Sequence, residues 1–181
     1  LCFLWSKSTK LVCYIQTCRD MKILVCLLVL ITGFSAVAQE TPEEAAARKT
    51  VEAFFVAFHN QDSIALKELA HPSVTMQSIA EDEEGNVNLT TDTYSDFITA
   101  ISSIPETTRF EEKLHSFEIK VNGPLANVIT PYSFFVNGEI SHCGVNSFQL
   151  FKEDGDWKII YIVDTRSKED CGSSLQFRIK N

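Results

Sequence analysis

Six side chains in the last third of the sequence have the chemistry of a small-molecule pocket. An apolar wall with a few polar groups that orient the ligand is the usual composition of such a site. Among the six, the Tyr132 phenol and the His142 imidazole could also transfer protons in a reaction, and the Asn146 carboxamide could donate or accept hydrogen bonds. The alternative is a filled core in which these three polar groups satisfy one another's hydrogen bonds. The candidate ligand-binding residues are Tyr132, Phe134, His142, Asn146, Phe148 and Tyr161.

The sequence offers little support for a metal site or another cofactor. The four histidines are widely spaced, and no His-x-x-x-His pair is present to place two imidazoles on one helix face. Glu68 and Glu112 each precede a histidine by three residues, a spacing that di-iron bundles use on long paired helices. Here the first pair ends a short predicted helix, and the second lies in a predicted strand, where the two side chains point to opposite faces. We therefore expect neither a metal nor a cofactor.

Three predicted strands must carry the candidate residues, because two tight-turn signals divide this part of the chain. Asn137-Gly138 and Asp154-Gly155 readily take the positive φ angles of a type I′ turn. The segments around them, 125–136, 140–152 and 157–166, are rich in β-branched and aromatic residues that suit a pleated surface. This pattern predicts an antiparallel meander.

The register of these strands decides which side chains share a face. Ideal two-residue turns would place Tyr132, Cys143 and Arg166 in one row, but they would also divide the apolar residues between the two faces of the sheet. Because a one-residue shift flips every side chain beyond it, a bulge or a three-residue turn near the first turn would return the apolar residues to one face. We favour that arrangement. It directs all six candidate residues into the pocket and turns Cys143, Asp164 and Arg166 outward, with Asp164 and Arg166 forming an ion-paired edge.

The first half of the domain is predicted to be largely helical. Apolar residues recur every three to four positions within 42–59, where Thr41 can cap the helix and Glu44 can close a capping box. Asp62 caps a second, short helix that ends before His71-Pro72. The other predicted elements are a strand pair at 74–80 and 87–91, a third helix at 94–104, and a strand at 110–121 that begins the main sheet.

The amino end of the sequence predicts export. We interpret residues 1–20, which begin with leucine and have no clear amphipathic period, as a segment upstream of the native protein, with Met21 as the initiator. Residues 21–38 have the basic start, apolar run and small-residue end of a signal peptide. A retained membrane anchor is the alternative, but the run is shorter than the roughly 20 residues that span a bilayer. We expect a periplasmic or extracellular domain at 39–166 with a tail at 167–181 and no stable membrane span.

The net charge argues against a nucleic-acid partner. Without residues 1–38 the chain holds 12 basic and 23 acidic residues, a net charge of −11. Such a charge repels phosphate backbones and anionic lipid headgroups. A small apolar or aromatic molecule, or a second copy of the chain, is the partner we expect.

Two cysteines remain after the predicted cleavage, Cys143 and Cys171. A single disulfide between them would suit an exported protein and would tether the tail to the sheet. The alternative is a reactive thiol at Cys143 beside His142, which requires a lowered thiol pKa.

Three packing motifs point to a known architecture. They are Phe54-Phe55 before a short Asp-capped helix, His71-Pro72 entering a strand, and the closing strand Gly155-Asp156-Trp157-Lys158-Ile159. With the order of elements over 42–166, they resemble the nuclear-transport-factor-two-like superfamily, which also holds ketosteroid isomerase, polyketide cyclases and many secreted bacterial proteins of unknown role. The resemblance implies an α+β domain with three N-terminal helices packed on a strongly curved antiparallel β-sheet. Such a conical, cystatin-like barrel encloses a pocket and often forms a homodimer through its sheet.

We therefore expect an exported domain that binds a small molecule, or dimerises, without catalysis. The alternative is a cofactor-free lyase, isomerase or hydrolase that uses Tyr132, His142 and Asn146 in the same pocket. The position of the superfamily's helix-one tyrosine holds Phe54 or Phe55 here, and its catalytic aspartates find no match. Both departures argue against isomerase activity.

Overall fold

The computed structural model of the chain describes residues 39–169 and Cys171. The predicted upstream segment, the predicted signal peptide and most of the predicted tail lie outside the described residues. The helices are α2 (Pro42–His59), α3 (Ser63–Leu69) and α4 (Tyr94–Ser102), and none of them has the length and apolar character needed to cross a membrane. The strands are β1 (Ala70–Glu81), β2 (Val87–Asp92), β3 (Phe110–Leu114), β4 (Glu118–Asn122), β5 (Leu125–Val136), β6 (Glu139–Glu153) and β7 (Asp156–Arg166).

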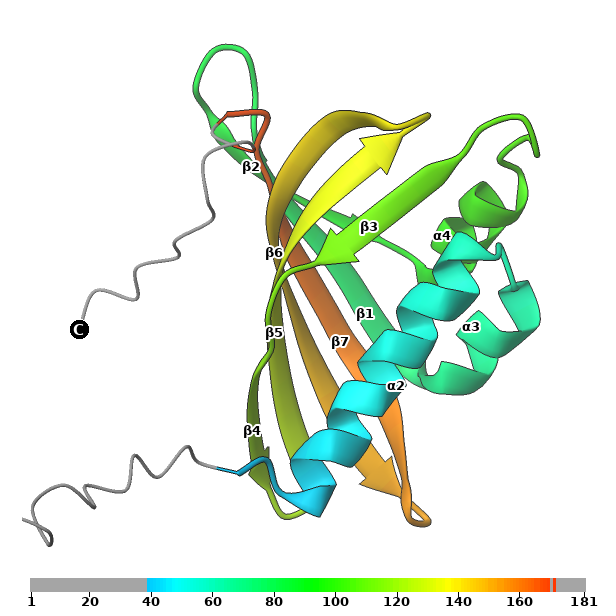
Figure 1. Cartoon of the computed structure of the whole chain (residues 1–181), viewed down its shortest axis with the longest axis vertical. Helices are drawn as coiled ribbons and strands as arrows, with labels where there is room; N and C mark the ends of the chain where they lie inside the picture. Colours follow the sequence, from blue (N-terminus) through cyan, green and yellow to red (C-terminus); the bar gives the residue numbers. More distant parts are fainter. Residues whose placement is uncertain (1–38, 170, 172–181) are drawn as a thin grey trace, which may run out of the picture. The chain divides into compact units, whose positions relative to one another are not determined.

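The helices begin where the sequence predicts. Oγ1 of Thr41 accepts a hydrogen bond from the Glu44 amide at 3.2 Å, and Oε2 of Glu44 accepts one from the Thr41 amide at 2.7 Å, which confirms the capping box. Oδ1 of Asp62 caps α3 by accepting from the amides of Ile64 and Ala65, at 3.1 and 3.0 Å. Helix α2 packs on the sheet (Figure 1). Its buried residues are Ala47, Val51, Phe54, Phe55, Ala57 and Phe58.

The strands form one curved, unclosed sheet in the order β2-β1-β7-β6-β5-β3, with β4 also paired to β5. The α+β prediction of three helices on a curved sheet is confirmed. The sheet is antiparallel, as predicted, except at one pair, where β1 runs parallel to β7. Hairpin turns fix the relative directions of β5, β6 and β7. The strand beside β7 is β1, which is far away in the sequence, so no tight turn between β1 and β7 requires them to be antiparallel.

The predicted strand at 110–121 is two strands, β3 and β4, which pair with the two halves of β5. The break lies opposite Pro131, whose carbonyl accepts from the His115 amide at 3.0 Å. The nitrogen of Pro131 faces the same neighbour but carries no hydrogen to donate, so the ladder is interrupted there.

Two bulges set the faces of the sheet. The first lies in β6, where Phe134 pairs with His142 but Phe135 pairs with Ile140. It confirms the predicted shift near the first turn. The second lies in β7, because Leu150 pairs with Ile159 but Gln149 pairs with Tyr161.

The second bulge corrects the expectations for Tyr161, Asp164 and Arg166, because one extra residue flips every side chain beyond it. Ile162, rather than Tyr161, lies opposite Phe148. The prediction that Tyr161 faces the pocket is wrong: its hydroxyl donates to Oε1 of Gln77, away from the cavity. The prediction that Asp164 and Arg166 point outward is also wrong, because both line the cavity.

Candidate functional site

A cavity of about 280 Å³ lies between the helices and the inner face of the sheet. Five of the six predicted ligand-binding residues line it: Tyr132, Phe134, His142, Asn146 and Phe148. Phenylalanines from α2 and α4, together with Met76, Ile101 and Ile162, complete an apolar wall. The cavity is near the small end of the usual range for ligand sites, so it fits a small molecule.

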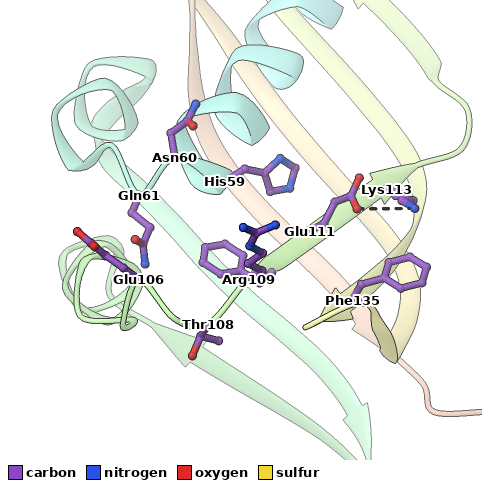
Figure 2. Close-up of a pocket in the computed structure, with 11 residues that line it drawn as sticks. His59, Asn60, Gln61, Glu106, Thr108, Arg109, Glu111, Lys113 and Phe135 are labelled. Carbon is purple, nitrogen blue, oxygen red and sulfur yellow. Dashed lines mark ion pairs between the residues drawn. The ribbon is translucent and has the colours of Figure 1, made fainter.

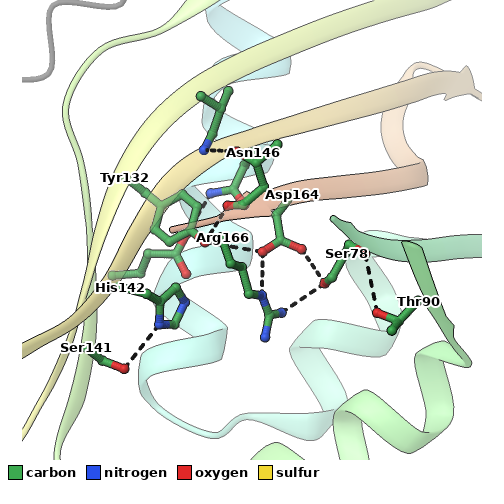
Figure 3. A network of polar contacts seen from close by, with 11 residues as sticks. Ser78, Thr90, Tyr132, Ser141, His142, Asn146, Asp164 and Arg166 are labelled. Atoms are coloured by element: carbon green, nitrogen blue, oxygen red, sulfur yellow. Dashed lines mark hydrogen bonds and ion pairs between the residues drawn. The ribbon is translucent and has the colours of Figure 1, made fainter. Parts of the chain in front are cut away.

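A polar network lies at one end of this cavity (Figure 3). Nε of Arg166 donates to Oδ2 of Asp164 at 2.7 Å, and its Nη2 donates to Oγ of Ser78 at 3.0 Å. Ser78 in turn donates to Oδ1 of Asp164. The Tyr132 hydroxyl lies 3.2 Å from Oδ2 of Asp164 and 3.0 Å from the Thr165 carbonyl, so its single proton is already shared between two acceptors.

Gly144 makes room for one of those acceptors. It lies opposite Tyr132 in β5, and an ideal Cβ at this position would be 1.7 Å from the carbonyl oxygen of Thr165. Only a residue without a Cβ lets this carbonyl point inward to the Tyr132 hydroxyl. Gly144 is therefore a positioning residue for the polar end of the cavity.

The variant Gly144→Ala is expected to lower the free energy of unfolding by at least about 1–3 kcal/mol, the usual cost of overpacking a buried site. The matched control is Ser147→Ala on the same strand, expected to change stability by less than about 0.5 kcal/mol. Urea denaturation of both variants makes the comparison. Equal midpoints would show that Thr165 can move aside without cost.

Glu112 is the site residue that the sequence analysis missed. Nδ2 of Asn146 donates to its Oε1 at 2.6 Å. The pKa of this carboxyl is raised to about 7, chiefly by burial and also by the Asp164 charge, against the opposite effects of Asn146 and Arg166. A signal was available, because Phe110 and Leu114 flank Glu112 at a spacing of two and a strand places all three on one face. The sequence argument considered Glu112 only as a metal ligand paired with His115, and it rejected that pair because the two side chains point to opposite faces of a strand.

The raised pKa of Glu112 predicts a pH dependence of stability. The carboxyl binds its proton more tightly in the folded state, at a pKa of about 7, than at its ordinary value of 4.5. Its contribution to stability is therefore complete below pH 4.5 and is lost as the pH rises to about 7. Denaturation at several pH values should show that Glu112→Gln removes this loss, whereas Glu111→Gln, at an exposed site on the same strand, keeps it. If the free energy of unfolding of Glu112→Gln fell with pH as steeply as that of the wild type, Glu112 would not be the group responsible.

The protein environment favours the neutral form of the imidazole at both His142 and His59. Burial lowers the pKa of His142, and the Arg166 charge lowers it further. Its ring lies against Phe134, with centroids 4.9 Å apart. Burial also lowers the pKa of His59, whose Nε2 accepts from the Glu112 amide at 2.9 Å. His59 therefore anchors the strand that carries Glu112.

Cys143 points away from the cavity and forms a disulfide with Cys171 across a Cα separation of 5.5 Å. The structure thus has the predicted pairing and not the alternative of a free thiol beside His142. Ser167 exchanges two backbone hydrogen bonds with Cys143, at 2.9 and 2.8 Å. The chain after β7 is consequently held to β6 both by the bridge and by this pair.

A second pocket of about 720 Å³ lies on the surface near the end of α2 (Figure 2). Several of its polar groups already serve the fold. The Gln61 side chain donates to the carbonyls of Ile101 and Ile104, and His59 accepts from β3. Lys113 lies 3.7 Å from Glu111 and over the Phe135 ring. The inner cavity, with its concentrated titratable groups, is therefore the stronger candidate site.

The described residues contain no group of three or more His, Cys, Asp or Glu side chains placed to hold a metal ion. The polar end of the cavity holds two carboxyl groups, Glu112 and Asp164, and the guanidinium of Arg166 pairs with Asp164.

Comparison with known proteins identifies the fold. No family model matches the chain, and no curated protein matches it. An NTF2-like protein from Cytophaga hutchinsonii has a TM-score of 0.56 and 17% identity, covering 70% of this chain and 100% of that one. A putative dehydratase of the NTF2-like family from Streptomyces avermitilis has a TM-score of 0.55 and 14% identity, covering 70% and 99%.

The beta subunit of a putative aromatic-ring-hydroxylating dioxygenase from Novosphingobium aromaticivorans is similar at a TM-score of 0.57 and 14% identity, covering 69% of this chain and 89% of that one. The chain therefore has the nuclear-transport-factor-two-like fold, also described as cystatin-like, which confirms the resemblance found in the sequence. At these identities the similarity concerns the fold alone, so the function must be argued from the cavity.

Proposed function

We propose that this domain binds a small, mainly aromatic or apolar molecule with one polar group in its inner cavity. The observation that carries the proposal is an apolar wall that ends in the partly buried carboxyl of Glu112. Oε1 of this carboxyl accepts a hydrogen bond from Asn146, whereas Oε2 has no hydrogen-bond partner among the described residues. Oε2 is therefore available to a ligand. An apolar cavity with few polar groups is how small-molecule sites are usually built.

The chemistry of Glu112 indicates which polar group the ligand carries. With a pKa of about 7, the carboxyl can donate a hydrogen bond when protonated and accept one when ionised. A hydroxyl group can complement both states, because it donates and accepts. The Tyr132 proton is already engaged, so this phenol can offer a ligand only its oxygen lone pairs. An aromatic alcohol is the ligand class that satisfies these constraints best.

Fluorescence titration with 2-naphthol, a bicyclic aromatic alcohol, tests the proposal. Saturable binding is expected, and Glu112→Ala should weaken it by about tenfold, the loss of a hydrogen bond to an ionisable group. Naphthalene, which lacks the hydroxyl, should bind the wild type and Glu112→Ala equally. The control variant Glu111→Ala should bind 2-naphthol like the wild type. Absence of saturable binding by the wild type would overturn the proposal.

A second candidate function is cofactor-free proton transfer, because a carboxyl with a pKa of about 7 in a cavity suits general acid–base catalysis. Glu112, rather than the Tyr132, His142 and Asn146 expected from the sequence, would act as the base. Incubation with 2-tetralone in deuterium oxide tests this by exchange of the acidic hydrogens beside its carbonyl. Exchange lost in Glu112→Gln would establish an enzyme, whereas exchange equal to the protein-free rate would leave binding alone.

We also propose that the domain is exported and can form a homodimer. The Cys143–Cys171 disulfide supports export, because such bridges persist in oxidising compartments. The apolar side chains that support dimerisation are Leu125, Ile129 and Phe151, which are 37–41% exposed on the outer face of the sheet. The mass of secreted material and its oligomeric state by light scattering test these two proposals.

A further inference from the structure

Two side chains separate the inner cavity from a groove on the surface. His142 and Arg166 line both spaces. The groove, of about 690 Å³, lies between the loop that joins β1 to β2 and the residues 167–169 that follow β7. The Arg166 side chain is 52% exposed, whereas that of Asp164, its partner at 2.7 Å, is 12% exposed. The guanidinium therefore lies at the boundary between the cavity and the groove.

The other surface pockets do not meet the cavity in this way. The pocket shown in Figure 2 shares no lining residue with the cavity. The groove between α2 and α3 and the pocket at the start of α4 also share none. Among these surface spaces in the described part of the chain, only the groove beside Arg166 borders the cavity directly.

The disulfide holds one wall of this groove. Cys143 directly follows His142, and its bridge to Cys171 ties the chain beyond β7 to β6. Ser167, which pairs with Cys143 through two backbone hydrogen bonds, directly follows Arg166. His142 and Arg166 are thus adjacent in sequence to Cys143 and Ser167, which the disulfide and the backbone hydrogen bonds hold in place.

We propose that ligands reach the inner cavity through this groove, past Arg166 and His142, and that the Cys143–Cys171 disulfide restricts the passage. This inference rests on the proposed binding function. The opposite wall of the groove is acidic and includes Glu81 at the end of β1 and Glu84 in the loop that follows. With the bridge in place, the wall at 167–169 cannot swing away from that loop. Without the bridge, the backbone pair at Ser167 can open, and Arg166 can leave the boundary with it.

The bridge should therefore control the rates of binding more than the affinity, as a gate does. Stopped-flow fluorescence with 2-naphthol can compare the bridged protein with the double variant Cys143→Ser/Cys171→Ser. Without the bridge, the association and dissociation rates should both rise by at least about threefold, while Kd changes by less than about twofold. Equal rates in the two proteins would overturn the gate. Absence of binding in the bridged protein would overturn the proposed function, and the gate with it.

A second variant keeps the test independent of the stability of the bridge-free protein. Glu81→Trp places a large ring on the opposite wall, at an exposed position, with the disulfide intact. Both rates should fall by at least about threefold, because the passage is narrower. The matched control is Val56→Trp, which adds the same ring at a position on α2 that is 60% exposed and does not border the cavity. Rates that stay unchanged in Glu81→Trp, or fall equally in both variants, would contradict the route.

Discussion

The variant Phe148→Ala is expected to lower the free energy of unfolding by about 3–5 kcal/mol, as large-to-small changes at buried aromatic positions do. Phe148 is fully buried at the centre of the sheet. Its ring contacts Phe54 and Phe55 of α2, with centroids 5.5 and 5.8 Å away. Removing the ring would enlarge the cavity and take away the contact that joins the helix to the sheet. Urea denaturation measures the loss.

Phe151→Ala is the matched control for this prediction. It removes the same side chain from the same strand, but on the outer face, where Phe151 is 37% exposed. The expected loss is below that of Phe148→Ala, at about 1 kcal/mol or less. If Phe151→Ala were the more destabilising of the two, the assignment of the inner and outer faces of β6 would be wrong.

Loss of the disulfide is expected to reduce stability by about 3–4 kcal/mol, because the bridge closes a loop with a sequence separation of 28 residues in the unfolded chain. The fold should survive, since the apolar core lies between the helices and the sheet and does not depend on the tail. Thermal denaturation of the exported protein, with and without a reductant, checks this.

The control for the disulfide prediction is Cys143→Ser/Cys171→Ser, whose melting temperature should not respond to the reductant. Thiol titration of the unfolded, unreduced exported protein gives an independent measure. Two free thiols per chain would show that the bridge does not form during export.

Local signals in the sequence were enough to predict the helices and the two hairpin turns. The cap at Thr41 and the positive φ of Asn137 and Asp154, at 52° and 50°, are properties of a few adjacent residues. The first bulge could also be inferred, because the apolar pattern conflicted with the ideal register. Five cavity residues followed from that single inference.

The second bulge could not be predicted, because its cause is not local. Near Ile160 the sequence is apolar at consecutive positions, 159–163, so either register would bury an acceptable set of side chains. Asp164 and Arg166 were therefore placed on the wrong face. Gly144 likewise lacks a local turn signal, since its role depends on a carbonyl 21 residues further along the chain.

The central claim is that the inner cavity binds a small aromatic molecule, and methyl NMR during titration with 2-naphthol tests it most directly. Met76, Ile101 and Ile162 line the cavity. The isoleucines at positions 64, 129 and 140 are 70%, 37% and 47% exposed and serve as internal controls. The account predicts saturable shifts of the three cavity methyl signals, with the exposed isoleucines unchanged. Shifts confined to the exposed isoleucines, or no shifts at all, would contradict it.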